Sequence, residues 1–207
     1  MHTSKGKWLF GLAVLLLSLT WAPVGAQATP IVYTYTGTAV GSLDGNAFAD
    51  VAFVITGTAD TSTISPWCCG TWQNTHTNAT IELTGLGTGT FLIATHTWIA
   101  EGCCMGFGRD LGSNLLTQLT SVPGLTDIGY GLDTSIGPIL WTAASTQGQF
   151  AGVATTLGSL TITDVRNVRF QASTVPEPAS VALLATGLAA VAYRRRKSLL
   201  NTLSRRG

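Results

Sequence analysis

The sequence predicts an all-β chain: a single antiparallel β-sandwich or jelly-roll-like domain, flanked by an amino-terminal signal helix and a short carboxyl-terminal transmembrane helix. The middle of the 207-residue chain is rich in Thr, Gly, Ser and β-branched residues, which favour strands and turns. Two uncharged apolar runs lie near the ends, at residues 8–20 and 181–193. Between them, short strand-like stretches alternate with glycine-rich turns, without intervening helices.

The amino end, residues 1–26, has the three parts of a secretory signal peptide. Two lysines precede the apolar run, and a small-residue segment ends at Ala26. We therefore expect export through the secretion translocon and cleavage by signal peptidase before Gln27, with a second possible site at Ala28. A permanent membrane anchor is the alternative, which the short run and the cleavage segment disfavour.

The body, residues 27–174, contains enough chain for one well-filled core. Its expected strands are residues 31–36, 47–56, 80–83, 89–97, 139–144 and 158–170. Its expected turns are residues 44–46, 85–87 and 137–138. The apolar spacing at residues 111–119 predicts one short helix or a loop there.

The charge of the body excludes one class of partner. The whole chain has a formal net charge of +1, but most of its basic residues lie in the terminal segments. The body has nine acidic residues against three arginines, which gives about −6. Phosphate binding needs clustered Lys and Arg, so the body should not bind nucleic acid.

The carboxyl end, residues 175–197, has three consecutive parts. Pro176 and Pro178 force extended backbone around Glu177, which suits a processing enzyme that grips an exposed segment. Residues 179–193 are uncharged, and as a helix they would span roughly 22 Å, less than the ~30 Å of a hydrocarbon core. A basic stop follows, which is held on the cytoplasmic side. It consists of Arg194, Arg195, Arg196 and Lys197.

These three parts, in this order and at this end of the chain, resemble the PEP-CTERM sorting domain of Gram-negative, exopolysaccharide-producing bacteria. The motif comprises Val175, Pro176, Glu177, Pro178, Ala179 and Ser180. The resemblance implies recognition by exosortase, a membrane enzyme thought to cleave at or near the motif. The chain departs from the family pattern in one respect: residues 198–207 form an additional tail after the basic stop. We expect this tail to be cytoplasmic. The alternative is an ordinary membrane anchor with a chance Pro-Glu-Pro.

The resemblance also implies where in the cell the protein is located. The protein would be anchored transiently in the inner membrane by its carboxyl-terminal helix, then reach the periplasm, the cell surface or the extracellular matrix. The body is similar to one group of uncharacterised PEP-CTERM proteins through residues 56–61 and 134–138. That likeness implies no activity.

Four cysteines form two adjacent pairs, and in an oxidising compartment they predict two disulfides. They are Cys68, Cys69, Cys103 and Cys104. Three pairings are possible, and we favour two bonds between the dipeptides over two vicinal bonds. A four-thiolate zinc site fits poorly, because its ligand pairs are usually separated by two to four residues.

The sequence assigns no catalytic residue, cofactor or metal site. His76 and His96 each lie in a Thr-His-Thr triplet, which predicts exposed positions on strands. Neither a Gly-x-Ser-x-Gly elbow nor a calcium or phosphate loop is present. The leading interpretation is a non-enzymatic surface or matrix protein that associates with exopolysaccharide.

Three other functions stay open. A carbohydrate-binding module would place aromatic rings on one exposed face, and the candidates are Trp67, Trp72, Trp98, Trp141 and Tyr130. An ice- or surface-binding protein is suggested by Thr-x-Thr triplets, although their irregular spacing disfavours an ordered array. A hydrolase would need His76 or His96 in a pocket beside a carboxylate.

Overall fold

The computed structural model describes residues 29–67, 70–109, 113–120, 129–175 and 187–188. Its elements are β1 (Pro30–Leu43), β2 (Asn46–Asp60), η1 (Thr61–Thr63), β3 (Ser65–Pro66), β4 (Thr71–Leu83), β5 (Gly87–Thr90), β6 (Thr95–Ala100), β7 (Cys104–Arg109), β8 (Ser113–Gln118), β9 (Ile136–Leu140), β10 (Ala144–Ser145), β11 (Val153–Thr155) and β12 (Gly158–Thr174). The prediction of an all-β body is confirmed.

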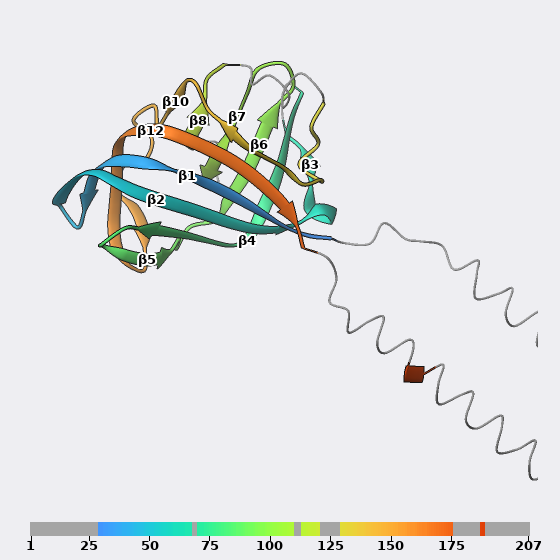
Figure 1. Ribbon diagram of the computed structural model, residues 1–207, viewed down its shortest axis with the longest axis horizontal. Coiled ribbons are helices and arrows are strands. Elements are labelled where there is room, and N and C mark those ends of the chain that lie inside the picture. Colours follow the sequence, from blue (N-terminus) through green and yellow to red (C-terminus); the bar gives the residue numbers. More distant parts are fainter. Residues whose placement is uncertain (1–28, 68–69, 110–112, 121–128, 176–186, 189–207) are drawn as a thin grey trace, which may run out of the picture.

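All of these strands belong to one antiparallel sheet (Figure 1). Its order is β10-β8-β7-β6-β4-β2-β1-β12-β11, with β3 and β5 also pairing with β4, and β9 with β12. The chain meanders from β1 to β8, and the long β12 then returns to the free side of β1. The first and last long strands of the body are therefore neighbours, close to the β11 end of the sheet.

The sheet curls so that its two halves face each other across the core. The Tyr35 hydroxyl, on β1, lies 2.9 Å from the Thr97 hydroxyl on β6 and donates to the Gly106 carbonyl on β7 at 3.2 Å. The Tyr35 and Phe107 rings meet edge to face, 5.8 Å apart. The expected antiparallel, sandwich-like body is thus built from one continuous curled sheet, because β4 links the two halves by pairing with β2 and with β6.

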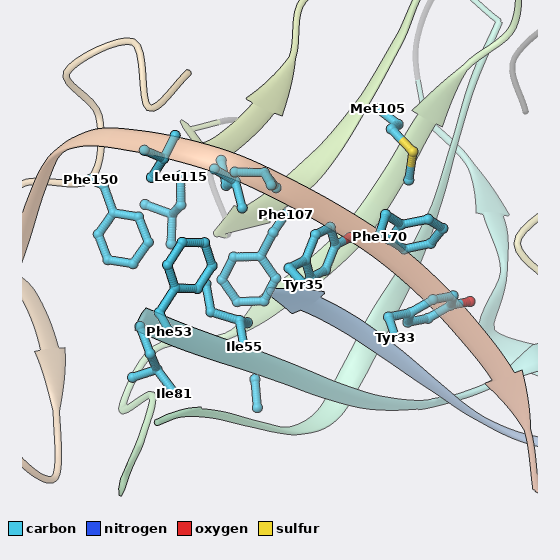
Figure 2. Packing of buried hydrophobic residues seen from close by; sticks show 14 of the residues in the cluster. Tyr33, Tyr35, Phe53, Ile55, Ile81, Met105, Phe107, Leu115, Phe150 and Phe170 are labelled. Carbon is cyan, nitrogen blue, oxygen red and sulfur yellow. The ribbon is translucent and has the colours of Figure 1, made fainter. Parts of the chain in front are cut away.

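Aromatic side chains fill the interior (Figure 2). The fully buried side chains are Tyr33, Tyr35, Phe53, Phe107, Phe150, Phe170, Ile31, Ile55, Ile81, Leu83, Met105 and Leu115. Burial alternates along β1 and β2, as expected for strands with one face on the core. The ring of Phe170 on β12 packs against Tyr33 and Tyr35 of β1 and against Trp141, with ring centroids 6.3, 5.2 and 6.5 Å away.

The predicted β1–β2 turn is confirmed, whereas the prediction for residues 111–119 is not. Asp44 and Gly45 both have positive φ, as a two-residue β1–β2 hairpin requires. The helix or loop predicted for residues 111–119 is wrong for residues 113–118, which form β8. Leu115 and Leu116 are both buried although adjacent, because a register shift in the β7–β8 pair interrupts the alternation that marks a strand in sequence.

The predicted terminal helices fall mostly outside the described residues. The signal segment 1–26 with its cleavage point at Ala26 and Gln27 lies there, as does most of the segment 179–193. Gly187 and Leu188 are the described part of that segment, and both are helical. Within the described part of the chain, no helix has the length and apolarity needed to cross a membrane.

Candidate functional site

The two ends of the folded body lie side by side (Figure 1). Ile31 near the start of β1 pairs with Thr174 at the end of β12. The Val175 amide donates to the Pro30 carbonyl at 2.8 Å, so this pairing extends one residue past the strand. Segments that precede β1 and follow β12 therefore connect to the body at one place.

Thr174 is held firmly at this junction. Its amide donates to the Ser135 hydroxyl at 2.9 Å, and the two side-chain hydroxyls are 3.0 Å apart. Val175, the next residue, is exposed. Every member of the described hydrophobic core lies between Ile31 and Ala172. The sheet is therefore complete one residue before the Pro-Glu-Pro segment.

A family comparison matches the residues at this junction. The family described as the PEP-CTERM protein-sorting motif matches residues 174–197. The chain carries a PEP-CTERM sorting motif. Such a motif indicates an exported, surface-targeted protein that an exosortase-type enzyme processes. The match begins at the last residue of β12, so folded body and sorting segment meet without a linker. No curated protein and no solved structure matches the chain.

The individual sorting residues are mostly beyond what the structure describes. Val175 is described, whereas Pro176, Glu177, Pro178, Ala179 and Ser180 are not, nor are Arg194, Arg195, Arg196 and Lys197. The roles assigned to these residues stay predictions.

The cysteines pair differently from the favoured prediction. Cys103 is bonded to Cys104, its neighbour, in the turn from β6 to β7. The favoured bonds between the two dipeptides are therefore wrong for this pair. Cys103 lies in the turn, where adjacent side chains need not point to opposite faces as they do in a strand. Cys68 and Cys69 lie outside the described residues.

Both histidines are buried, so the prediction of exposed strand histidines is wrong. His76 of β4 points into the core, because the sheet curls around the face that carries it. Its Nδ1 lies 2.9 Å from the Thr95 hydroxyl and its Nε2 lies 3.0 Å from the Thr97 hydroxyl. Its ring stacks on Phe107 at 5.5 Å. Burial, and to a lesser degree His96, lower the pKa of His76 to about 3.

Two glycines make room for these imidazole rings. A Cβ atom at Gly57 would lie 2.5 Å from Nε2 of His76, and one at Gly108 would lie 2.5 Å from Nε2 of His96. Each ring thus occupies the space of an absent side chain on a nearby strand. The His76 ring is bonded to two threonine hydroxyls and stacked on Phe107, so it packs as part of the core.

The five candidate aromatic residues do not share one surface. Trp98, Trp141 and Tyr130 are buried, and Trp141 packs against Tyr35 and Phe170. Trp67 and Trp72 are 41% and 44% exposed. Trp67 contacts His96 edge to face at 5.8 Å. Trp72 instead borders a cleft, so these two tryptophans have different surroundings despite similar exposure.

The cleft beside Trp72 encloses about 60 Å³. The residues that line it are Trp72, Ile99, Glu101, Gly129, Tyr130 and Gly131. Trp72 and Ile99 are directly paired across β4 and β6. The Tyr130 hydroxyl donates to the Thr134 carbonyl at 2.9 Å, which fixes the opposite wall. An exposed indole, a carboxylate and glycine backbone thus meet at one opening.

Strand register also produces a threonine row that the sequence spacing does not reveal. Thr34, Thr56, Thr80 and Thr90 are consecutive partners across β1, β2, β4 and β5. The neighbouring row contains Val54 and Glu82, so the threonines do not repeat in two dimensions. A single row on a curled sheet is not the flat lattice that an ice-binding surface needs.

Among the described residues, no cluster of three or more His, Cys, Asp or Glu side chains could hold a metal ion.

Proposed function

We propose that this chain is a non-enzymatic surface or matrix protein. It is exported, held briefly in the inner membrane by its carboxyl-terminal segment, and released to become associated with exopolysaccharide. The junction at Thr174 is the observation that supports this proposal. A sorting motif begins there, at the last residue of a sheet that is already complete.

Release at this junction would leave the body intact. β12 is paired with β1 on one side and with β9 and β11 on the other. The backbone up to Thr174 is therefore already hydrogen-bonded within the sheet. A processing enzyme needs backbone that is not already paired in a sheet. Pro176 has no amide hydrogen and cannot continue the pairing. The first accessible bond therefore lies after Val175.

A binding role agrees with the chemistry of the body better than a catalytic one does. His76 is neutral and bonded to hydroxyls, so it cannot act as a general base without breaking its own packing. Glu101 is the carboxylate among the described residues that line the cleft, whereas most glycosidases use two. The proposal includes no cofactor and no metal.

The sorting claim is tested by intact-mass analysis in two hosts that differ only in exosortase. With the enzyme present, we expect a released species that begins at Gln27 and ends at or before Ser180. The Glu177→Gln variant should stay in the membrane fraction with its carboxyl end intact, because it loses the charge between the two prolines. Glu82→Gln is the matched control, since Glu82 is an exposed glutamate on β4.

Two results would contradict the proposal. One is a released wild-type protein that still carries residues beyond Ser180. The other is equal release in the host without exosortase.

A further inference from the structure

Trp72 is the exposed end of the inward-facing row of side chains on β4. It lies on the same face of β4 as Asn74 and His76, both of which are buried in the interior. Its cross-strand partner Ile99 is buried as well, yet the indole of Trp72 is 44% exposed. The row of inward-facing side chains on β4 therefore ends in a large apolar ring that is partly exposed to solvent and lines the cleft.

Tyr130 and its two neighbouring glycines form another part of the cleft wall. Tyr130 is 7% exposed, its hydroxyl is used by the Thr134 carbonyl, and its ring lies 6.5 Å from Phe170 of β12. Gly129 and Gly131 flank it and carry no side chains to cover their peptide groups. A ligand against Trp72 would therefore lie beside glycine backbone rather than beside further side chains.

Glu101 adds the charged group of the cleft. It lies in the β6–β7 turn and is exposed. A carboxylate accepts hydrogen bonds and donates none at neutral pH, so it suits a ligand that is rich in hydroxyl donors. It repels acidic ligands, and the net charge of about −6 on the body adds to that repulsion.

We propose that this cleft, formed by Trp72, Glu101 and the 129–131 segment, binds one ring of a neutral polysaccharide. A pyranose ring has an apolar face of C–H groups and an edge of hydroxyls. The C–H face matches the electron-rich face of the indole, and the hydroxyls match Glu101 and the glycine peptides. This inference names a binding site for the proposed association with exopolysaccharide. It rests on that proposed function, because only the association with exopolysaccharide indicates that the ligand is a polymer.

Native affinity electrophoresis with the purified full-length chain in mild detergent tests the site. Gels contain dextran, galactomannan or xyloglucan as neutral probes, and alginate as an acidic one. We expect at least one neutral polymer to retard the protein, and Trp72→Ala to weaken the retardation by tenfold or more. Trp67→Ala is the matched control, because Trp67 is exposed to a similar extent but contacts His96. It should be retarded like the wild type.

Trp72→Ala could weaken binding simply because it destabilises the fold, and a lowered melting temperature would reveal this. A second pair of variants is therefore measured as well. Trp72→Phe keeps an aromatic face and should keep most of the retardation, whereas Glu101→Gln should lose several-fold. The proposal is overturned if no neutral polymer retards the wild type, if alginate alone does so, or if Trp67→Ala and Trp72→Ala behave alike. It is also overturned if Trp72→Phe and Glu101→Gln are both retarded like the wild type. Sorting is measured by intact mass and sugar binding by gel retardation. A failure of the binding proposal can therefore be distinguished from a failure of the sorting proposal.

Discussion

Because His76 stays neutral in the folded protein, the folded body should lose stability at mildly acidic pH. Its ring is enclosed between Phe107, Thr95 and Thr97, where a charge would lose its hydration. Its pKa in the folded protein is about 3, against 6.5 for an unperturbed histidine. Between these two values the unfolded chain binds a proton that the folded chain does not. The contribution of this site to stability is therefore complete above pH 6.5 and declines as the pH falls toward 3.

The size of the effect follows from linkage. One proton difference changes the free energy of unfolding by about 1.4 kcal/mol per pH unit, so lowering the pH from 7 to 5 should cost about 2 kcal/mol. Asp60 accepts hydrogen bonds from Ser62 that hold its pKa below its usual value, so this carboxyl group titrates under more acidic conditions than a free aspartate.

The assay is urea unfolding of the released protein at pH 7, 6 and 5, followed by tryptophan fluorescence. His76→Gln keeps a neutral polar side chain that does not titrate. We expect it to be less stable than the wild type at pH 7 but to lose less stability between pH 7 and 5. The His76 explanation is refuted if wild type and His76→Gln lose the same free energy over this range.

Two further substitutions test the packing of the curled sheet. Phe170→Ala should cost about 3–5 kcal/mol, because Phe170 is fully buried among four aromatic rings, whereas Leu140→Ala on the adjacent β9, which is 48% exposed, should cost less than about 0.5 kcal/mol. Equal midpoints of urea unfolding for these two variants would contradict the assignment of the core. Gly57→Ala should cost about 1–3 kcal/mol, because its new carbon would lie 2.5 Å from Nε2 of His76. Gly131→Ala, whose added carbon would lie 3.4 Å from Asp133, is the control, and thermal melting that ranks Gly131→Ala as the less stable variant would show that His76 does not need this space.

Features that depend on a few consecutive residues could be predicted from the sequence. The Asp-Gly turn at residues 44–45 is confirmed, because few residue pairs tolerate positive φ at both positions. The strand expected at residues 47–56 is confirmed within β2. The sorting motif was recognisable for the same reason, since two prolines, an apolar run and a basic cluster are properties of the local chain.

Features that depend on how distant strands meet could not be predicted. His76 and His96 look like polar members of exposed strands, and only the curl of the sheet buries them. The cleft joins Trp72 and Tyr130, which are far apart in the chain, and the threonine row depends on the register of four strands.

The sequence by itself thus determined that the body is built of strands, where several of its strands and turns lie, and where the sorting segment lies, because backbone sterics and the order of apolar and charged residues act locally. The tertiary structure alone decided which side chains lose water and which meet across strands, because burial and register depend on pairings between residues that the sequence keeps apart.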